Sequence, residues 1–391
     1  MAGGGPLGGI YEIGATVALS EAIDGLEVHQ ADVFVGVSSG GLIAAALANG
    51  VTPARLARIL IENDTEEIFD PEMLLRPAFG EYFNRLLSLP HLISSSALDY
   101  LRHPWHHGLF ESFQRLSRAI PTGVFDSRGI DRVLRNLFSQ RGRTNDFRKL
   151  KHRLFLVATD LDSGESIAFG SPGHDDVAIS TAVQASAALP GLFPPVEING
   201  RHYVDGALIK TLHASVALKE GADIVFCVNP LVPFDAELAA RRNGTSSQHL
   251  NDGGLPVVLS QTFRAIIHSR MRVGMDRYKH QYPHADVLLF EPTPDDAEMF
   301  FTNVFSYRDR RRLCEHAYQR TRIDLYRRRH ELMPILARHG LKLNLSVLKD
   351  HRYTLLHRPT RKSKVSLNTA THALDTSLDE LQRWLELRRP A

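Results

Sequence analysis

One short stretch limits the folds open to this chain more than any other feature. Residues 32–48 pass from an apolar run through Gly36-x-Ser38-x-Gly40 into an alanine-rich run. Glycines on both sides keep side chains out of a tight turn, so Ser38 lies exposed between a buried strand and a helix. The free N–H groups at the start of that helix favour an oxyanion beside the serine. The stretch therefore predicts a strand-to-helix turn with Ser38 as nucleophile, supported by Gly36 and Gly40.

The motif Gly-x-Ser-x-Gly also arises by chance in chains of this length. Its position argues against chance, because a random match would rarely fall on a strand-to-helix turn. A Ser-Asp-His hydrolase would place several strands before its nucleophile, whereas only one fits before Ser38. The 19 histidines leave a catalytic triad open, but none lies in a strand-end turn like that of Asp205.

A glycine-rich segment opens the chain, with Gly3, Gly4 and Gly5 followed by Pro6. Apolar residues at helical spacing follow it, so the sequence predicts a loop that leads into a helix at residues 10–24. The backbone N–H groups of such a loop hold an oxyanion or a phosphate. A dinucleotide site is disfavoured, because no strand precedes the glycines and no P-loop lysine follows them. The alternative is a flexible terminus.

The remainder of the chain alternates apolar runs with helical patterns. Strands are expected at residues 32–36, 153–160, 166–169, 222–229 and 286–290, and helices at 41–49, 52–61, 257–278 and 308–329. A small-residue helix ends before Pro190, and a hairpin at Asn199 and Gly200 leads into a strand that ends at Asp205. Residues 234–254 are expected to form a mobile polar loop. This alternation predicts an α/β fold with a mainly parallel sheet.

We expect three regions along the chain. Residues 1–295 form the catalytic domain, with a cap or lipid-facing insertion at about 69–125; residues 296–345 form a C-terminal helical segment; and residues 346–391 form a polar, partly disordered tail with a short helix at 378–387. Histidines at 103, 106 and 107 lie in the insertion, but they lack acidic or cysteine partners nearby, so we expect no metal there. The arginine-rich segment 308–329 is either a solvated helix face or a surface for acidic headgroups or a protein partner.

Composition excludes several classes of protein. A net charge of +2 over 391 residues gives no general preference for nucleic acid. The two cysteines, Cys227 and Cys314, are far apart, which argues against a disulfide framework or a metal cluster. The sequence shows no signal peptide and no apolar run of about 18 residues. We expect a cytoplasmic protein with peripheral membrane contact, and the sequence predicts no oligomeric state.

In four segments the chain resembles the patatin-like phospholipase family. The matching segments, in chain order, are Gly3-Gly4-Gly5-Pro6-Leu7-Gly8, Gly36-Val37-Ser38-Ser39-Gly40, Ala185-Ser186 with Pro190, Pro194 and Pro195, and Asp205-Gly206-Ala207. The match covers residues 3–230 and extends to the strand near 290. The resemblance implies a three-layer α/β/α fold with a C-terminal helical extension.

The resemblance also implies a chemistry. Ser38 attacks an ester carbonyl, Asp205 accepts its proton, and N–H groups of Gly3, Gly4 and Gly5 hold the oxyanion. Gly206 and Ala207 form the turn that supports the base. The implied substrate is a phospholipid or another acyl ester, with no cofactor and no metal. Two alternatives stay open, namely a non-catalytic binding or scaffold protein of the same fold and a soluble esterase or thioesterase.

Two departures from the family pattern affect the glycine loop. Leu7 stands where family members carry Arg or Lys, and only Met1 and Ala2 precede the glycines, where family members have an apolar strand. We therefore expect the loop to lack an anchor on its amino side, or to be held by other contacts. A poorly fixed loop would make a weaker catalyst than a chain extended upstream by such a strand.

Overall fold

The computed structural model describes residues 1–62, 122–210, 212–243, 249–302, 307–350 and 352–355. Within it, Met1–Tyr353 forms one compact unit. The expected insertion up to residue 121, its three histidines and the helix expected at 378–387 lie outside the described residues. The three predicted regions of the chain stay a prediction.

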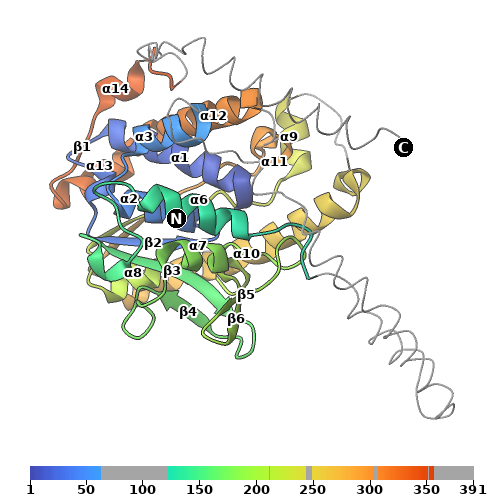
Figure 1. The fold of residues 1–391 in the computed structure, drawn as a ribbon. Coiled ribbons are helices and arrows are strands. Elements are labelled where there is room, and N and C mark those ends of the chain that lie inside the picture. The colour runs from blue at the N-terminus through green and yellow to red at the C-terminus, as the bar shows by residue number, and fades with distance from the viewer. Residues whose placement is uncertain (63–121, 211, 244–248, 303–306, 351, 356–391) are drawn as a thin grey trace, which may run out of the picture. The chain divides into compact units, whose positions relative to one another are not determined.

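A five-stranded sheet carries the centre of the fold (Figure 1). It contains β2 (Val33–Val37), β3 (Arg153–Asp160), β4 (Ser166–Phe169), β5 (Val196–Ile198) and β6 (Arg201–Asp205). β2 runs parallel to β3, whereas β4 and β6 run antiparallel to it. β5 pairs antiparallel with β6 through the hairpin expected at Asn199 and Gly200. Strand β3 is buried along most of its length, as its continuous apolar run requires.

A second, parallel pair joins β7 (Ile224–Val228) to β8 (Asp286–Phe290). The first two residues connect it to β2. The amine of Met1 donates to the Val35 carbonyl at 2.8 Å, and the Val37 N–H donates to the Met1 carbonyl at 3.3 Å. On the other side, the Ala2 N–H donates to the carbonyl of Val228 at 3.1 Å. The α/β class is confirmed, but the central sheet is mixed, because β4, β5 and β6 pair antiparallel.

Helices lie on both sides of β2 (Figure 1). α1 (Gly5–Ala22), α2 (Ser39–Ala48) and α3 (Pro53–Ala57) lie on one side, and α3 continues as a π-helical turn at Arg58–Glu62. The other side carries α8 (Ala214–Lys219) and α10 (Gly254–Gln281). α6 (Arg128–Phe138) packs on α7 (Ile179–Ser186), which contacts β3 and β6. Short 3-10 turns occur at Val28–Gln30, Phe147–Lys149, Gly206–Leu208 and Leu250–Gly253.

The C-terminal helices belong to the same compact unit. They are α11 (Ala297–Phe301), α12 (Tyr307–Arg327), α13 (Arg329–Arg338) and α14 (Leu345–Lys349), and β9 (Lys342–Leu343) pairs with β1 (Ile23–Asp24). α12 packs along α1. The approach is close at Gly14, where an added Cβ would lie 2.3 Å from the carbonyl oxygen of Cys314. The glycine is therefore required by this contact.

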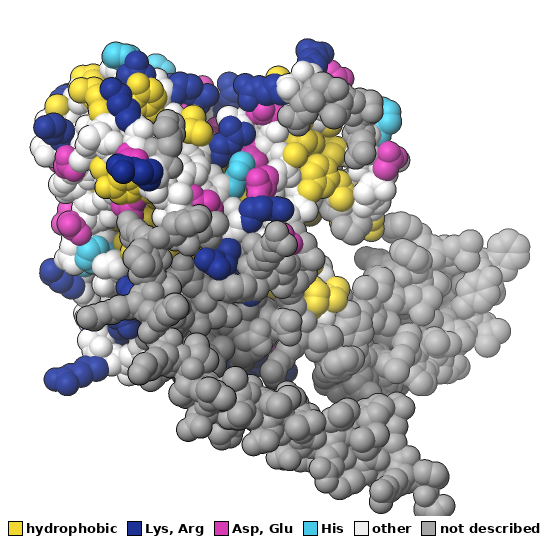
Figure 2. All heavy atoms as spheres, turned by 90° about the horizontal axis from the view of Figure 1, so that it is seen from above, with side chains coloured by type: hydrophobic (Ala, Val, Ile, Leu, Met, Phe, Trp, Pro, Cys, Tyr) yellow, Lys and Arg dark blue, Asp and Glu magenta, His cyan; other side chains and the backbone are white. Residues whose placement is uncertain are grey.

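Several arginines of the basic segment are engaged within this unit. Arg312 pairs with Glu298 at 2.8 Å, and Arg322 donates to the carbonyl oxygens of Val347 and Asp350 at 2.6 and 2.8 Å. On the face shown in Figure 2, Lys and Arg side chains lie among Asp and Glu side chains. These contacts favour a structural role for the cations that they engage.

Two predictions of local structure are wrong in their bounds. α1 begins at Gly5 rather than at residue 10, because Pro6 lies in its first turn, where a missing N–H costs nothing. α9 (Ala236–Asn243) occupies part of the segment expected to be a loop. Asp235 Oδ1 accepts from the Leu238 N–H at 2.9 Å and so caps the start of that helix.

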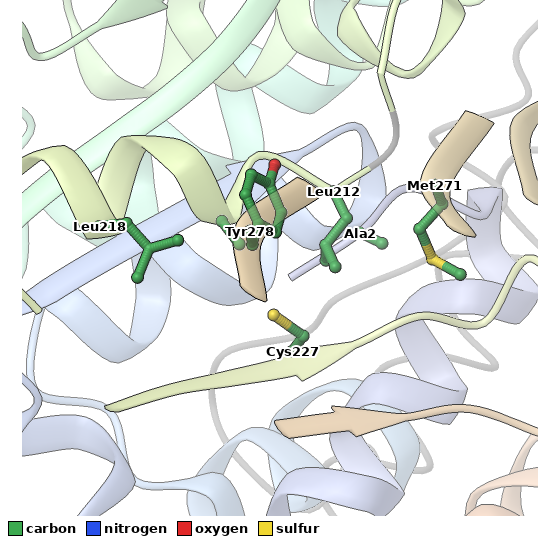
Figure 3. Packing of buried hydrophobic residues seen from close by; sticks show 7 residues of the cluster. Ala2, Leu212, Leu218, Cys227, Met271 and Tyr278 are labelled. Atoms are coloured by element: carbon green, nitrogen blue, oxygen red, sulfur yellow. The ribbon is translucent and has the colours of Figure 1, made fainter. Parts of the chain in front are cut away.

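The face of β7 and β8 that meets α8 and α10 is apolar. Ala2, Leu218, Cys227, Met271 and Tyr278 pack together there (Figure 3). Cys227 and Cys314 are both buried, and they are not joined by a disulfide. Among the described helices, none combines the length and hydropathy that a membrane span needs.

Candidate active site

The register of the central sheet brings Ser38 close to Asp205. β2 pairs with the first part of β3 up to Val37 opposite Val157, and β6 pairs with the last part of β3 from Asp205 opposite Ala158. The ends of β2 and β6 thus meet at neighbouring positions of β3. Ser38 follows the last residue of β2, and Asp205 is the last residue of β6. They lie 167 positions apart in the sequence, and the pairing of both strands with β3 brings them together.

Ser38 has the strained backbone expected at the apex of the turn. Its φ is 53° and its ψ is −129°, directly before α2. A non-glycine residue with positive φ persists only where its surroundings hold it. Here the Ser38 N–H donates to the Oγ of Ser186 at 2.9 Å, and that hydroxyl donates to the carbonyl of Val157 at 2.6 Å. Ser186, which sequence reasoning gave no role, therefore holds the turn against β3.

Asp205 is buried, with 2% of its surface exposed, and faces Ser38, which is 6% exposed. Burial raises the pKa of Asp205 to about 6, while hydrogen bonds from the Ser38 hydroxyl and the Ala207 N–H act to lower it. The bond from the Ala207 N–H to Oδ1 measures 2.8 Å. The carboxyl is thus a stronger base than an exposed aspartate, and the nearby Ser38 hydroxyl favours its ionised form.

The glycine segment lies directly against the serine. A Cβ added at Gly3 would come within 2.8 Å of the Ser38 Cβ, so only glycine allows this approach. Gly4 packs against the ring of Pro230 and precedes Gly5, the first residue of α1. In the part of the chain that the structure describes, no acceptor for the N–H groups of Gly3 and Gly4 is found. These two residues directly precede the first turn of α1, whose own first N–H groups lack intrahelical acceptors.

The expectation that nothing anchors this segment on its amino side is wrong. Met1 and Ala2 hydrogen bond to β2 on one side and to β7 on the other, and Ala2 is fully buried. These two residues anchor the glycine segment because they lie between β2 and β7 and hydrogen bond to both strands. The structure thus gives the alternative expected, in which other contacts hold the loop.

The supporting residues of both turns lie where the motifs put them. Gly36 lies in β2, one residue before its end, and packs against α2. Gly206 and Ala207 form the turn after Asp205. Gly40 faces the carbonyl of Ala2 and the Oε1 of Glu12.

Glu12 is a fully buried carboxyl behind the turn. Its burial raises its pKa well above the ordinary value, against the effects of the Met1 amine and the Ala2 backbone. Sequence reasoning missed Glu12, because an acid within an apolar helix gives no sign of the face it occupies.

The nearby histidines do not complete a triad in this geometry. The Nδ1 atom of His202 lies 3.9 Å from Oδ2 of Asp162, and the His202 side chain is half exposed. Burial lowers the pKa of His213 to about 3, and its buried Nε2 has no hydrogen-bond partner among the described residues. No imidazole is among the groups that shift the pKa of Asp205.

A cavity of about 760 Å³ lies beside the loop that follows β7. The residues that line it include Val232, Phe234, His249, Leu250, His268 and Pro294. Pro230, at the start of the same loop, contacts Gly4 and Gly8. Among the described residues, no group of three or more His, Cys, Asp or Glu side chains is arranged to hold a metal ion.

Comparison with known families gives one match that covers more than half of the chain. The family model described as Patatin-like phospholipase matches residues 1–218. This region contains Ser38, Asp205 and the glycine segment, together with the whole five-stranded sheet.

Comparison with individual proteins gives more distant matches. An NTE family protein of Mycobacterium bovis and one of Mycobacterium tuberculosis, both named as uncharacterized, are 33% identical over 100 residues, which is 26% of this chain and 16% of each relative. The "Probable lipid hydrolase 463L" of Invertebrate iridescent virus 6 is 22% identical over 216 residues, which is 55% of this chain and 61% of the relative. The matches therefore span less than two thirds of these relatives. The crystal structure of VipD from Legionella pneumophila aligns with a TM-score of 0.38 and 17% identity, over 82% of this chain and 65% of that one.

Proposed function

Because the chain belongs to the patatin-like phospholipase family, we propose that it is a serine acyl hydrolase that cleaves carboxylic esters of lipids with Ser38 and Asp205. The observation that carries the proposal is the sheet register, which brings the strained turn at Ser38 next to Asp205, a buried carboxyl whose pKa is raised to about 6. At neutral pH this carboxyl is ionised, yet it is more basic than an ordinary aspartate. A base of that kind suits proton transfer from an alcohol.

In the first half of the reaction, Ser38 Oγ attacks the ester carbonyl carbon as its proton passes to Asp205. The C–O bond to the leaving alcohol then breaks, and Asp205 returns the proton to the alkoxide. The product is an acyl-enzyme at Ser38. In the second half, Asp205 takes a proton from water, the hydroxide attacks the acyl carbonyl, and Ser38 recovers its proton as the fatty acid leaves.

The oxyanion of each tetrahedral intermediate is assigned to backbone donors beside Ser38. The N–H groups of Gly3, Gly4 and Gly5 supply one side, and the first turn of α2 supplies the other. Removal of one such donor costs about 3 kcal/mol in other enzymes, because the donors are fixed before the charge develops. The bonds of Met1 and Ala2 to β2 and β7 support such fixing here.

The substrate class follows from the family and from the relatives' names. A phospholipid or lysophospholipid presents its ester at a lipid surface, so the proposal includes peripheral contact with a membrane. The viral relative is named a probable lipid hydrolase, in agreement with this class. The reaction needs no cofactor, because nucleophile, base and oxyanion donors all come from the chain.

The test combines labelling with turnover. A fluorophosphonate probe is expected to label the wild type at Ser38, and Ser38→Ala is expected to remove both the label and hydrolysis of a chromogenic short-chain ester. Removal of a serine nucleophile in other hydrolases lowers kcat by about a millionfold. Circular dichroism checks that the variant is folded.

The same assays separate the alternatives. A wild type that neither reacts with the probe nor cleaves esters would be a binding protein of this fold. A protein that cleaves soluble esters but releases no fatty acid from phospholipid vesicles would be a soluble esterase or thioesterase. Labelling at Ser39, or equal labelling of Ser38→Ala, would refute the assignment of the nucleophile.

A further inference from the structure

Helix α10 is apolar on two opposite sides. Its inner side buries Met271 and Tyr278 against Ala2 and Cys227 (Figure 3). On its outer side, Leu255, Leu259, Ile266 and Val273 are 69, 45, 48 and 63% exposed. A helix normally has a polar outer face, and contiguous exposed apolar groups mark a site of interaction. Within the part of the chain that the structure describes, this outer side is exposed and is a candidate interaction surface.

These four residues form a continuous line, which we call the apolar stripe. At 100° per residue, positions 255, 259, 266 and 273 lie within about 40° of one another around the helix. From Leu255 to Val273 the stripe is about 27 Å long, at about 1.5 Å per residue. Val258 and Phe263, also exposed, flank it. Several exposed apolar residues at these positions are hard to explain as chance.

The charge of α10 indicates the kind of partner. The helix carries five basic residues, Arg264, Arg270, Arg272, Arg277 and Lys279, and a single acidic one, Asp276. All of these except Arg264 are exposed, and they lie in the C-terminal half of the helix. An apolar line next to a cationic surface matches a lipid–water interface, where acyl chains lie beside anionic headgroups. A protein partner would need no such excess of one charge.

The inner side of α10 holds the loop that supports the glycine segment. Arg264 is buried and donates to the carbonyl oxygens of Pro230 and Val232 at 3.4 and 3.2 Å. Pro230 in turn packs against Gly4, one of the proposed oxyanion donors. A shift of α10 would therefore move the backbone that fixes this donor.

The same helix also contacts the segment that follows the proposed base. Arg270 donates to the carbonyl oxygen of Leu208 at 3.4 Å, three residues after Asp205. The Nζ atom of Lys210 lies 4.9 Å from the ring centre of Tyr278. α10 thus links its exposed stripe to both sides of the active site.

We propose that α10 lies in the lipid–water interface, with its apolar stripe among the acyl chains and its cations on anionic headgroups. The proposal rests on the lipid acyl hydrolase function, and it assigns the surface by which that site meets its substrate. Docking by this helix places the glycine segment and Asp205 next to the membrane. Through Arg264 and Arg270, the docked helix also holds in place the loop that supports the glycine segment and the segment that follows Asp205.

Vesicle binding tests the stripe. The stripe pair, Leu259→Ser with Ile266→Ser, is made in a Ser38→Ala background, which prevents hydrolysis. The control pair in the same background is Leu161→Ser with Ile323→Ser, a Leu and an Ile on other elements that are slightly more exposed, at 53 and 56%. Cosedimentation uses vesicles of phosphatidylcholine and phosphatidylglycerol. The stripe pair is expected to weaken binding at least about tenfold, since two side chains no longer leave water. The control pair is expected to change binding by less than about twofold.

A charge variant tests the cationic half. Arg272→Gln with Arg277→Gln is expected to weaken binding to vesicles with phosphatidylglycerol and to leave binding to pure phosphatidylcholine unchanged. Its binding is also expected to depend less on salt concentration, because fewer ionic contacts remain. Equal loss on both vesicles would contradict the assignment of headgroup contacts.

Other results would overturn the proposal. If the wild type does not bind vesicles, or if the stripe pair binds as well as the control pair, α10 is not the docking helix. If light scattering shows a dimer that the stripe pair converts to a monomer while vesicle binding is unchanged, the stripe is an interface between copies. If vesicle binding depends on the stripe but no ester is cleaved by the protein with Ser38 intact, the docking proposal stands and the proposed function fails.

Discussion

At the scale of single residues, the site depends on burial rather than on an unusual side chain. Asp205 is an ordinary carboxyl whose pKa burial raises to about 6, which suits the role of base that we propose for it. Ser38 is an ordinary hydroxyl whose position is set by the bond from its N–H to Ser186. Both effects come from residues distant in the sequence. The sequence thus proposed Ser38 and Asp205 through their turns. It gave no role to Ser186, which it placed only within a family segment, or to Glu12, which belongs to no motif.

The pKa of Asp205 predicts how activity changes with pH. Asp205 must be ionised to accept the serine proton, so kcat/KM is expected to fall about tenfold per pH unit below about 6 and to level off above it. Asp205→Asn is expected to lose at least about a thousandfold at pH 8, within the range for loss of a general base. As controls, His202→Ala and His213→Ala are each expected to lose at most about tenfold. A histidine as essential as Asp205 would show a triad instead.

At the scale of elements, α1 has two tasks that its sequence separates. Its start follows directly on the glycine segment that lies against Ser38, and its middle packs so closely on α12 that Gly14 has no room for a side chain. The start of α1 was predicted too late, since glycines usually indicate a loop. The contact between α1 and α12 could not be predicted, because both helices show ordinary apolar spacing and nothing specifies which face meets which partner.

The contact at Gly14 predicts a stability difference between two glycines. Gly14→Ala is expected to lower the free energy of unfolding by about 1–3 kcal/mol, because the new Cβ overlaps the backbone of α12 at Cys314. Gly274→Ala, also inside a helix, is the control. Nothing lies within 4 Å of its added Cβ, so alanine is expected to stabilise the helix by up to about 1 kcal/mol. Urea unfolding measures both. An unchanged midpoint for Gly14→Ala would show that the helices separate without cost.

At the scale of the molecule, the bounds of the strands were predicted better than their pairing partners. β3, β4 and β8 begin and end where their apolar runs do, because a buried strand is bounded by polar or turn residues. The choice of pairing partner, in contrast to the bounds of a strand, is not determined by the residues of that strand alone. The antiparallel pairing of β4 and β6, and the two residues that join β2 to β7, depend on partners far along the chain. The meeting of Ser38 with Asp205 is likewise a result of register.

The compact unit Met1–Tyr353 predicts where the chain can be shortened. Leu313, Leu325, Leu332 and Leu336, on α12 and α13, are fully buried. Each contributes about 1.5–3 kcal/mol on burial, so together with their neighbours they approach the whole stability of about 5–15 kcal/mol that a domain has. A chain cut after residue 295 is therefore expected to lose its cooperative thermal transition and its ester hydrolysis. A chain cut after residue 355 is expected to keep both, which calorimetry and the ester assay measure. If the shorter chain folds and hydrolyses esters, then the boundary predicted at 295 is a true domain boundary and α12 is an accessory to the catalytic fold.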